Sequence, residues 1–243
     1  MKGVKTAVTL EAVVDLAKSV EHEVDYVLVT GDISQDCTPA SYELAAEIFS
    51  RLGRPAYTLP GNHDEDIPLK QSPLMSGLFN AENHFLAGGW IVILLDSVIH
   101  GMIAGRLSHD ELVRLDNLLK KHADKHALVC LHHNPVNMRP DREDPVMLKN
   151  PDDFFAVIDS HANVRAVIWG HVHQEHFEER RGVRLMACPS TCIQFKPTST
   201  GVTIDEQTPG YRRIVLNADG SVTTKVMRLS ALPEGLEVTG EDL

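Results

Sequence analysis

The sequence of 243 residues lacks long apolar runs, has few aromatic side chains (5%) and contains only four cysteines. A transmembrane helix needs about 18 or more consecutive apolar residues, so we predict no membrane span. The first residues have neither the apolar core nor the small-residue cleavage site of a signal peptide. Cys37, Cys130, Cys188 and Cys192 do not show the paired spacing of a zinc site. We therefore expect reduced thiols and a cytoplasmic location.

Basic residues are outnumbered, with 23 Lys and Arg against 34 Asp and Glu and a formal net charge of −11. Binding to nucleic acid or to an anionic membrane surface needs extended fields of Lys and Arg, so both are disfavoured. A small-molecule partner is expected, and the sequence leaves the oligomeric state open. Histidine, in contrast, is abundant: its 13 residues equal Phe, Trp and Tyr together. This excess points to a metal site.

Apolar runs alternate with helical patterns through about residue 170. Strands are predicted at residues 26–30, 56–59, 90–95, 127–131 and 164–169, and helices at 10–20, 38–53, 109–121 and from 151. This alternation predicts an α/β fold with a mostly parallel sheet. The run at 26–30 has the continuous apolar character of a strand buried on both faces.

The last third of the sequence changes to closely spaced strand patterns. They fall at residues 177–180, 183–187, 211–216 and 222–228, with turn residues between the members of each pair. No linker separates them from the preceding part, so we expect one domain over residues 1–232 with a C-terminal antiparallel layer. The polar residues 233–243 are predicted to form a flexible tail.

Polar side chains follow four of the predicted strands at the point where each strand ends. They are Asp32, Asn62 with His63, His132 with His133, and His171 with His173. Each group alone is more simply a turn or a surface feature. Because the carboxyl ends of parallel strands meet at one edge of a sheet, we expect the groups to converge. A mixture of carboxylate, amide and imidazole suits Mn, Fe, Zn or Co better than Mg or Ca.

The same segments resemble the calcineurin-like metallophosphoesterases. The motifs are Gly-Asp at residues 31–32, Gly-Asn-His-Asp at 61–64, His-His-Asn-Pro at 132–135 and Gly-His-Val-His at 170–173. Residues 188–197 and 209–212 are similar to the bacterial class III 3′,5′-cyclic AMP phosphodiesterases. The resemblance implies an αββα sandwich with mostly parallel core strands.

The resemblance also implies a centre of two divalent metal ions. Asp32 would bridge them, Asn62, His132 and His171 would surround one ion, and His173 would bind the other. Spacing leaves the choice between His132 and His133 open, and the resemblance favours His132. Iron or manganese is favoured, with zinc or cobalt as alternatives. Such a pair lowers the pKa of a bridging water and neutralises the phosphoryl oxygens.

Catalytic roles fall on the loop that follows the second strand. The resemblance implies that Asn62 and His63 face the substrate phosphate. His63 is the candidate to stabilise or protonate the leaving 3′-oxygen. Asp64 has two equally weighted interpretations: it orients the His63 imidazole, or it caps backbone N–H groups of its loop.

The sequence departs from the family at its beginning. The family opens with a buried strand ending in Asp-x-His, and no Asp-x-His occurs at a plausible early position of this sequence. A helix without the strand before it leaves a gap in the sheet, so we expect roughly 20–30 further residues before Met1 in the functional protein. A short form with a weakened or single-ion site is the alternative.

The expected function is hydrolysis of 3′,5′-cyclic AMP to AMP. The alternatives are a phosphodiesterase for another small diester, such as a glycerophosphodiester or a 2′,3′-cyclic nucleotide, and a truncated, non-catalytic form that binds metal or nucleotide. A nuclease is disfavoured by the net charge of −11.

Overall fold

The computed structural model describes residues 2–64, 79–80, 82–139, 143–197 and 203–237. Its helices are α1 (Thr6–Val20), α2 (Pro39–Ser50), α4 (His109–Lys121) and α5 (Pro151–Asp159). Its strands are β1 (Val27–Val29), β2 (Ala56–Thr58), β3 (Phe79–Asn80), β4 (His84–Ala87), β5 (Trp90–Leu94), β6 (His126–Leu131), β7 (Val164–Trp169), β8 (His176–Arg180), β9 (Val183–Ala187), β10 (Gln194–Lys196), β11 (Thr203–Asp205), β12 (Gly210–Leu216) and β13 (Val222–Arg228).

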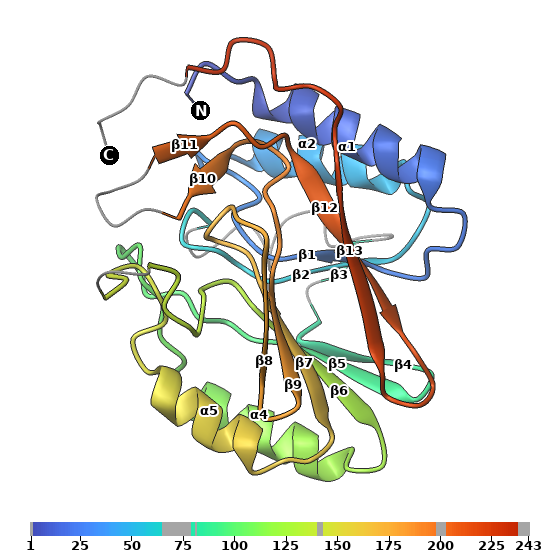
Figure 1. Ribbon diagram of the computed structural model, residues 1–243, viewed down its shortest axis with the longest axis vertical. Coiled ribbons are helices and arrows are strands. Elements are labelled where there is room, and N and C mark those ends of the chain that lie inside the picture. The colour runs from blue at the N-terminus through green and yellow to red at the C-terminus, as the bar shows by residue number, and fades with distance from the viewer. Residues whose placement is uncertain (1, 65–78, 81, 140–142, 198–202, 238–243) are drawn as a thin grey trace.

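The strands form two layers between two pairs of helices, as Figure 1 shows. The larger sheet has the order β4-β5-β6-β7-β9-β8, with a parallel centre and antiparallel strands at both edges. The smaller sheet, β1-β2-β3, is parallel. Helices α4 and α5 cover the larger sheet, while α1 and α2 lie beside the smaller one. The predicted α/β class with a mostly parallel core is therefore confirmed.

The central strands are apolar because both of their faces are covered. On β5, Ile91 and Ile93 pack toward the cluster that includes Leu115 of α4. Val92 and Leu94, at the alternate positions, belong to a second cluster. All five residues of β5 are buried. This pattern matches the continuous apolar run that predicted the strand.

Helix caps fix where the helices begin. The Thr38 side chain accepts a hydrogen bond from the Ser41 amide at the start of α2, and the Ser108 side chain accepts one from Glu111 at the start of α4. Thr and Ser are favoured at the residue before a helix because their side-chain oxygens accept from its first backbone amides. The carboxylate of Glu111, however, accepts from the Asp96 amide at 2.9 Å. The start of α4 is thereby fastened to the chain that leaves β5.

Strand β1 differs from its prediction. Its residues, Val27, Leu28 and Val29, are only partly buried, although their apolar run predicts a strand covered on both faces. The reason is its position: β1 is an edge strand of its sheet, and a cavity lies next to it.

The C-terminal third is also divided differently from the prediction. Strands β8 and β9 join the larger sheet, whereas β12 and β13 form a separate antiparallel ribbon. Leu236, expected in a loose tail, packs against a cluster that contains Val4. The Glu237 amide donates to the Lys2 carbonyl at 3.2 Å. Residues 238–243 of the expected tail lie outside the described residues.

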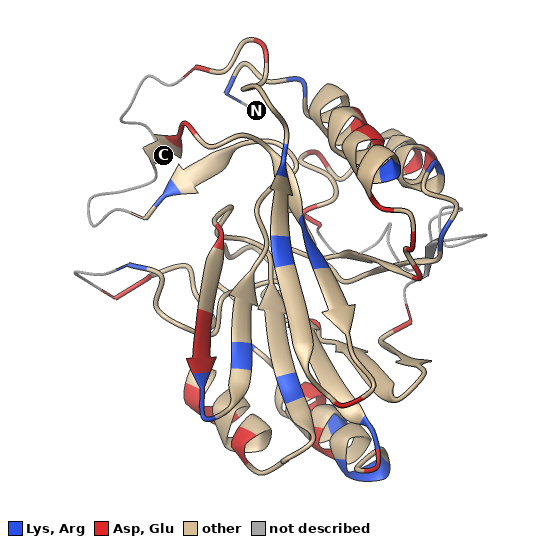
Figure 2. Cartoon of the chain, turned by 45° about the vertical axis from the view of Figure 1, so that its right-hand side comes forward, with Lys and Arg blue, Asp and Glu red and all other residues tan. Residues whose placement is uncertain are grey.

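None of the described helices has the length and the apolar character needed to cross a membrane. Charges of both signs lie on α1 and on α4, as Figure 2 shows.

Candidate metal centre

The ends of four strands bring the predicted site residues to one edge of the two sheets. Asp32 follows β1, Asn62 follows β2, His132 follows β6, and His171 and His173 follow β7. Asp32, His171 and His173 have positive φ values of 54°, 62° and 50°. Side chains other than glycine rarely adopt this conformation, and such strain gathers at functional sites.

His132 stands at the centre of the cluster. Its Nδ1 lies 2.7 Å from the Thr30 carbonyl oxygen. Its Nε2 lies 3.2 Å from Asn62 Oδ1, 3.3 Å from Asp32 Oδ2 and 3.2 Å from His171 Nδ1. One carboxylate oxygen, one amide oxygen and two imidazole nitrogens thus converge. This is a donor set typical of a borderline divalent metal ion.

Electrostatics within the cluster favour a cation. Burial alone raises the pKa of Asp32, but the neighbouring His132 and the His63 amide outweigh it and hold that pKa well below its usual value. Burial lowers the pKa of His132, and the Asp32 carboxylate more than reverses the effect, so the pKa of His132 is raised. A positive charge is therefore favoured beside the Asp32 carboxylate, at the point where the donor atoms converge.

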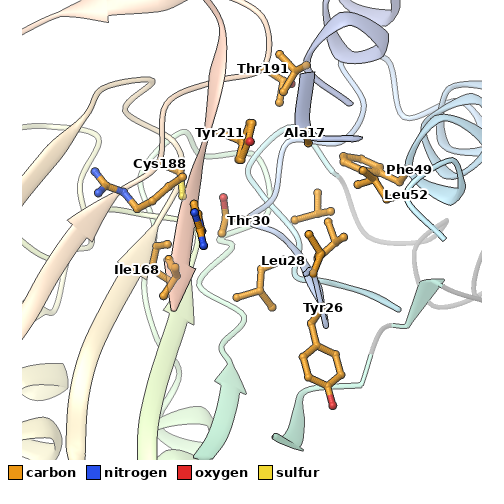
Figure 3. Close-up of a pocket in the computed structure, with 18 of the residues that line it drawn as sticks. Ala17, Tyr26, Leu28, Thr30, Phe49, Leu52, Ile168, Cys188, Thr191 and Tyr211 are labelled. Carbon is orange, nitrogen blue, oxygen red and sulfur yellow. The ribbon is translucent and has the colours of Figure 1, made fainter. Parts of the chain in front are cut away.

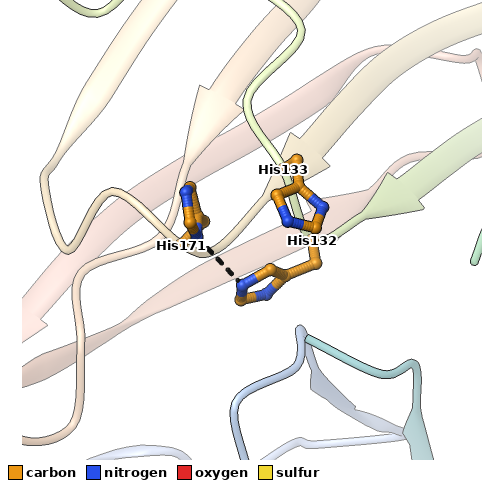
Figure 4. Close-up of side chains that lie close together, drawn as sticks. All are labelled: His132, His133 and His171. Atoms are coloured by element: carbon orange, nitrogen blue, oxygen red, sulfur yellow. Dashed lines mark hydrogen bonds between the residues drawn. The ribbon is translucent and has the colours of Figure 1, made fainter. Parts of the chain in front are cut away.

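His133 lies in the same cluster but has no free nitrogen. Figure 4 shows its ring beside His132 and His171, and one ligand nitrogen from each of the three rings lies within 4.8 Å of the others. Its Nδ1 is 2.8 Å from Ser97 Oγ and its Nε2 is 3.0 Å from the Ile103 carbonyl oxygen. Burial, with the nearby His132, lowers the pKa of His133 to about 3. This geometry favours His132 over His133 as a metal ligand, because both nitrogens of His133 already have partners.

His171 and His173 each have a buried nitrogen without a hydrogen-bond partner among the described residues, namely His171 Nε2 and His173 Nδ1. Buried polar atoms are rarely left unpaired, so these atoms call for an explanation. Burial lowers the pKa of His173 to about 4 and the pKa of His171 well below its ordinary value. The Phe195 ring stacks on His173 at 4.7 Å. Both imidazoles are thus held in the neutral form that binds metals.

The loop carrying Asn62 is fastened to the site through its backbone. The His63 amide donates to Asp32 Oδ1 at 3.0 Å. Gly61 lies so close to the site that a Cβ atom there would stand 2.1 Å from Asp32 Oδ1. A glycine is therefore required at this point, where the backbone approaches the carboxylate.

Asp64 belongs to this loop and is buried, with a relative exposure of 3%. Its carboxylate accepts from the amides of Ile33, Ser34 and Gly61 at 2.9–3.1 Å and from the Tyr42 hydroxyl at 3.0 Å. None of the hydrogen bonds within the described part of the chain joins Asp64 to the His63 imidazole. Of the two interpretations of Asp64, the geometry corresponds to capping of backbone N–H groups.

Sequence reasoning missed the partner of His63, which is Gln35. Gln35 Nε2 lies 3.0 Å from His63 Nδ1. A glutamine in a loop carries no catalytic signal by itself, and only its place three residues after Asp32 could have drawn attention to it. The Thr30 carbonyl was also missed, since every residue has such a group. The Ser97 hydroxyl that fixes His133 gave no distinguishing pattern either.

Comparisons with known proteins identify the family of the chain. The sequence profile described as "Calcineurin-like phosphoesterase" matches residues 6–175. A protein of Vibrio vulnificus named 3′,5′-cyclic adenosine monophosphate phosphodiesterase CpdA is 39% identical over 230 residues, which cover 94% of this chain and 84% of that protein. The CpdA protein of Pseudomonas aeruginosa is 37% identical over 227 residues, covering 93% of this chain and 83% of that protein.

Solved structures show the same fold. The crystal structure of a dimetal phosphatase from Danio rerio superposes with a TM-score of 0.66 at 15% identity, covering 96% of this chain and 89% of that one. The profile match spans more than half of the chain, and the bacterial relatives exceed 30% identity over most of it. The chain therefore belongs to the calcineurin-like phosphoesterase family.

Proposed function

We propose that the chain is a metal-dependent phosphodiesterase that hydrolyses 3′,5′-cyclic AMP to AMP. The convergence of Asp32, Asn62 and His171 on His132 Nε2 is the observation that carries the proposal. The names of the CpdA relatives support the choice of substrate.

The residues of the site have separate tasks in this proposal. Asp32, Asn62, His132 and His171 hold one ion, and His173 contributes a separate buried nitrogen toward a second. Metal ions bound there supply a water of lowered pKa and neutralise the phosphoryl oxygens. Iron or manganese is favoured, with zinc or cobalt as alternatives.

His63 is placed to act on the leaving group. Its backbone is fixed by the bond to Asp32, and its imidazole is held by Gln35 at Nδ1, which leaves Nε2 for the substrate. We assign it the proton that the 3′-oxygen takes up when the bond to phosphorus breaks.

The free cysteines of the structure fit the predicted cytoplasmic location, where thiols stay reduced.

The test is turnover by the purified chain after chelation and reloading with Mn²⁺ or, without oxygen, Fe²⁺. AMP formation from 3′,5′-cyclic AMP is compared with hydrolysis of 2′,3′-cyclic AMP and glycerophosphocholine. We expect 3′,5′-cyclic AMP to be preferred. Asn62→Ala should lower kcat/KM at least about tenfold.

His22→Ala is the control, because His22 is exposed, follows the C-terminal end of α1 and is not among the residues that converge on His132. Preference for either of the other diesters would mean that this diester, and not 3′,5′-cyclic AMP, is the substrate. Metal binding without turnover of any diester would favour the non-catalytic form.

A further inference from the structure

The segment of residues 188–196, which runs from the end of β9 through β10, passes beside the candidate metal centre. Figure 3 shows Cys188 and Thr191, from the first part of this segment, at the wall of the cavity beside β1. Asp32 and His173 line the same cavity. The family profile matches residues 6–175, so the match does not extend to this segment. What the segment does at the centre therefore follows from its contacts.

Phe195 of this segment stacks on the imidazole of His173. The centroids of the two rings are 4.7 Å apart, and the planes of the rings differ by 7°. Stacking at such a separation is favourable for aromatic rings. Rotation of an imidazole about its Cβ–Cγ bond has a broad energy profile, so a histidine ring without neighbours turns readily. A turn of the His173 ring would drive its edge against the Phe195 ring, which therefore restricts the direction of the imidazole nitrogens.

The backbone of Phe195 holds the same histidine. Its amide donates a hydrogen bond to the His173 carbonyl at 3.1 Å. His173 has a φ of 50°, which is an unfavourable conformation for a residue with a side chain. Such conformations persist where the surrounding contacts determine them. Phe195 thus fixes His173 at two points, its backbone and its ring.

Phe195 is itself held firmly. It lies opposite Ile204 in the antiparallel pair of β10 and β11, and it packs against the apolar cluster that contains Val4. The preceding residue, Gln194, is buried and closes the loop before β10: its side chain accepts from the Ser190 amide at 3.1 Å and donates to the Ser190 carbonyl at 2.8 Å. A ring supported in this way provides a fixed wall for its neighbour.

We propose that Phe195 is a positioning residue of the metal centre, which holds the His173 imidazole in the orientation that binds an ion. This inference rests on the proposed metal-binding role of His173. It extends that proposal, because a residue beyond the matched family region then controls the affinity of one ion site.

The test removes the aromatic plane and keeps the apolar bulk. Phe195→Leu lacks the plane, Phe195→Tyr retains it, and Phe155→Leu makes the same change in a buried phenylalanine of α5 as the matched control. NMR relaxation of labelled histidine carbons in the metal-free chain gives the order parameter of the His173 ring, whose signal is assigned from its loss in His173→Gln. We expect this order parameter to fall from about 0.85, typical of a rigid group, to below about 0.6 in Phe195→Leu alone.

Binding of Mn²⁺ provides a second measurement. Calorimetry of the metal-free chain identifies the binding step that depends on His173 as the step that His173→Gln removes. We expect Phe195→Leu to weaken this step about tenfold, and Phe195→Tyr and Phe155→Leu to leave it unchanged. The Mn²⁺ concentration for half-maximal turnover of 3′,5′-cyclic AMP should rise by the same factor, with kcat at saturating Mn²⁺ close to that of the parent.

Four results would overturn the inference. They are an unchanged order parameter in Phe195→Leu, an equal fall in Phe155→Leu, equal weakening of the Mn²⁺ step in Phe195→Leu and Phe195→Tyr, and a His173→Gln variant that loses no binding step. A chain that hydrolyses none of the diesters would instead contradict the proposed function. The order parameter and the calorimetry would still test the role of Phe195 in that case, because neither needs turnover.

Discussion

The Nδ1 atom of His132 lies 2.7 Å from the carbonyl oxygen of Thr30, and this bond decides how the imidazole is used. A carbonyl oxygen only accepts, so Nδ1 carries the proton and donates it. The lone pair is then on Nε2, the nitrogen that faces Asn62 and Asp32. The end of β1 thus orients a ligand that follows β6, in the way that carbonyl partners orient histidines at metal sites.

His132→Gln should abolish this arrangement. The amide of glutamine cannot reproduce both the bond to Thr30 and a nitrogen lone pair at the position of Nε2. We expect metal affinity and kcat/KM to fall at least about 100-fold, with the fold retained. Titration of the chelated protein with Mn²⁺ by calorimetry measures the affinity, and circular dichroism checks the fold. Unchanged affinity would remove His132 from the ligand set.

His133→Gln should behave in the opposite way. Both nitrogens of His133 are occupied by Ser97 and Ile103, so its removal leaves buried partners unsatisfied and spares the ligands. We expect the free energy of unfolding to fall by about 1–3 kcal/mol, with metal stoichiometry unchanged. Urea unfolding and metal analysis of the same preparation test both statements. A loss of bound metal with unchanged stability would make His133 a ligand.

The pH dependence of stability should report on the same histidine. Its pKa is about 3 in the folded chain because of burial, against about 6.5 for an ordinary imidazole. As the pH falls below 6.5 the unfolded chain takes up a proton that the folded chain does not, so stability is lost on acidification. Between pH 7 and pH 5.5 we expect a loss of about 1 kcal/mol from His133.

The His133 contribution is isolated by comparing the metal-free protein with the His133→Gln variant at both pH values. The variant should lose less stability than the parent over this interval, because the other groups contribute equally to both proteins. Parallel losses in the two proteins would contradict the assignment of a buried, neutral His133.

We expect Asp64 to contribute more to the stability of the fold than to catalysis. Its carboxylate accepts from Tyr42 and from three backbone amides, so Asp64→Asn should turn favourable bonds into contacts between donors. We expect a loss of about 2–3 kcal/mol for this variant, and about 1–2 kcal/mol for Tyr42→Phe, which removes one bond to the same carboxylate. Urea unfolding measures both. A fall in kcat at unchanged stability would restore the role of orienting His63.

Much of the fold follows from apolar runs, and the misses have specific causes. Strands β7, β9 and β13 begin and end where the sequence predicts, because turns or capping signals bound each run. The two-residue strand β3 and the short β10 and β11 have no periodicity to detect. The burial of β1 was wrongly predicted. An apolar run indicates that a strand can be covered on both faces, but the actual cover depends on the elements that lie beside the strand.

The site, like the fold, has features that the sequence predicts and features that it does not. Convergence of Asp32, Asn62, His132 and His171 could be expected because strand ends meet at one sheet edge. The different environments of His132 and His133 could not be expected, because they depend on which partners surround two adjacent residues. Those partners are the Thr30 carbonyl in one case and Ser97 with Ile103 in the other.

Gln35 gives the most specific test of the leaving-group step. Its amide holds His63 Nδ1 at 3.0 Å, so Gln35→Ala should leave the His63 ring free to rotate without touching the metal ligands. We expect kcat for 3′,5′-cyclic AMP to fall about 10–100-fold with little change in KM.

Bis(p-nitrophenyl) phosphate provides the comparison, because nitrophenolate departs without being protonated. If His63 protonates the leaving oxygen, this diester should be hydrolysed at nearly the parent rate. Gln35→Glu, whose carboxylate can accept a hydrogen bond from a protonated Nδ1, should retain more activity on the cyclic nucleotide than Gln35→Ala. Equal losses on both substrates would mean that Gln35 supports the loop as a whole, and the proton would then have to come from another group.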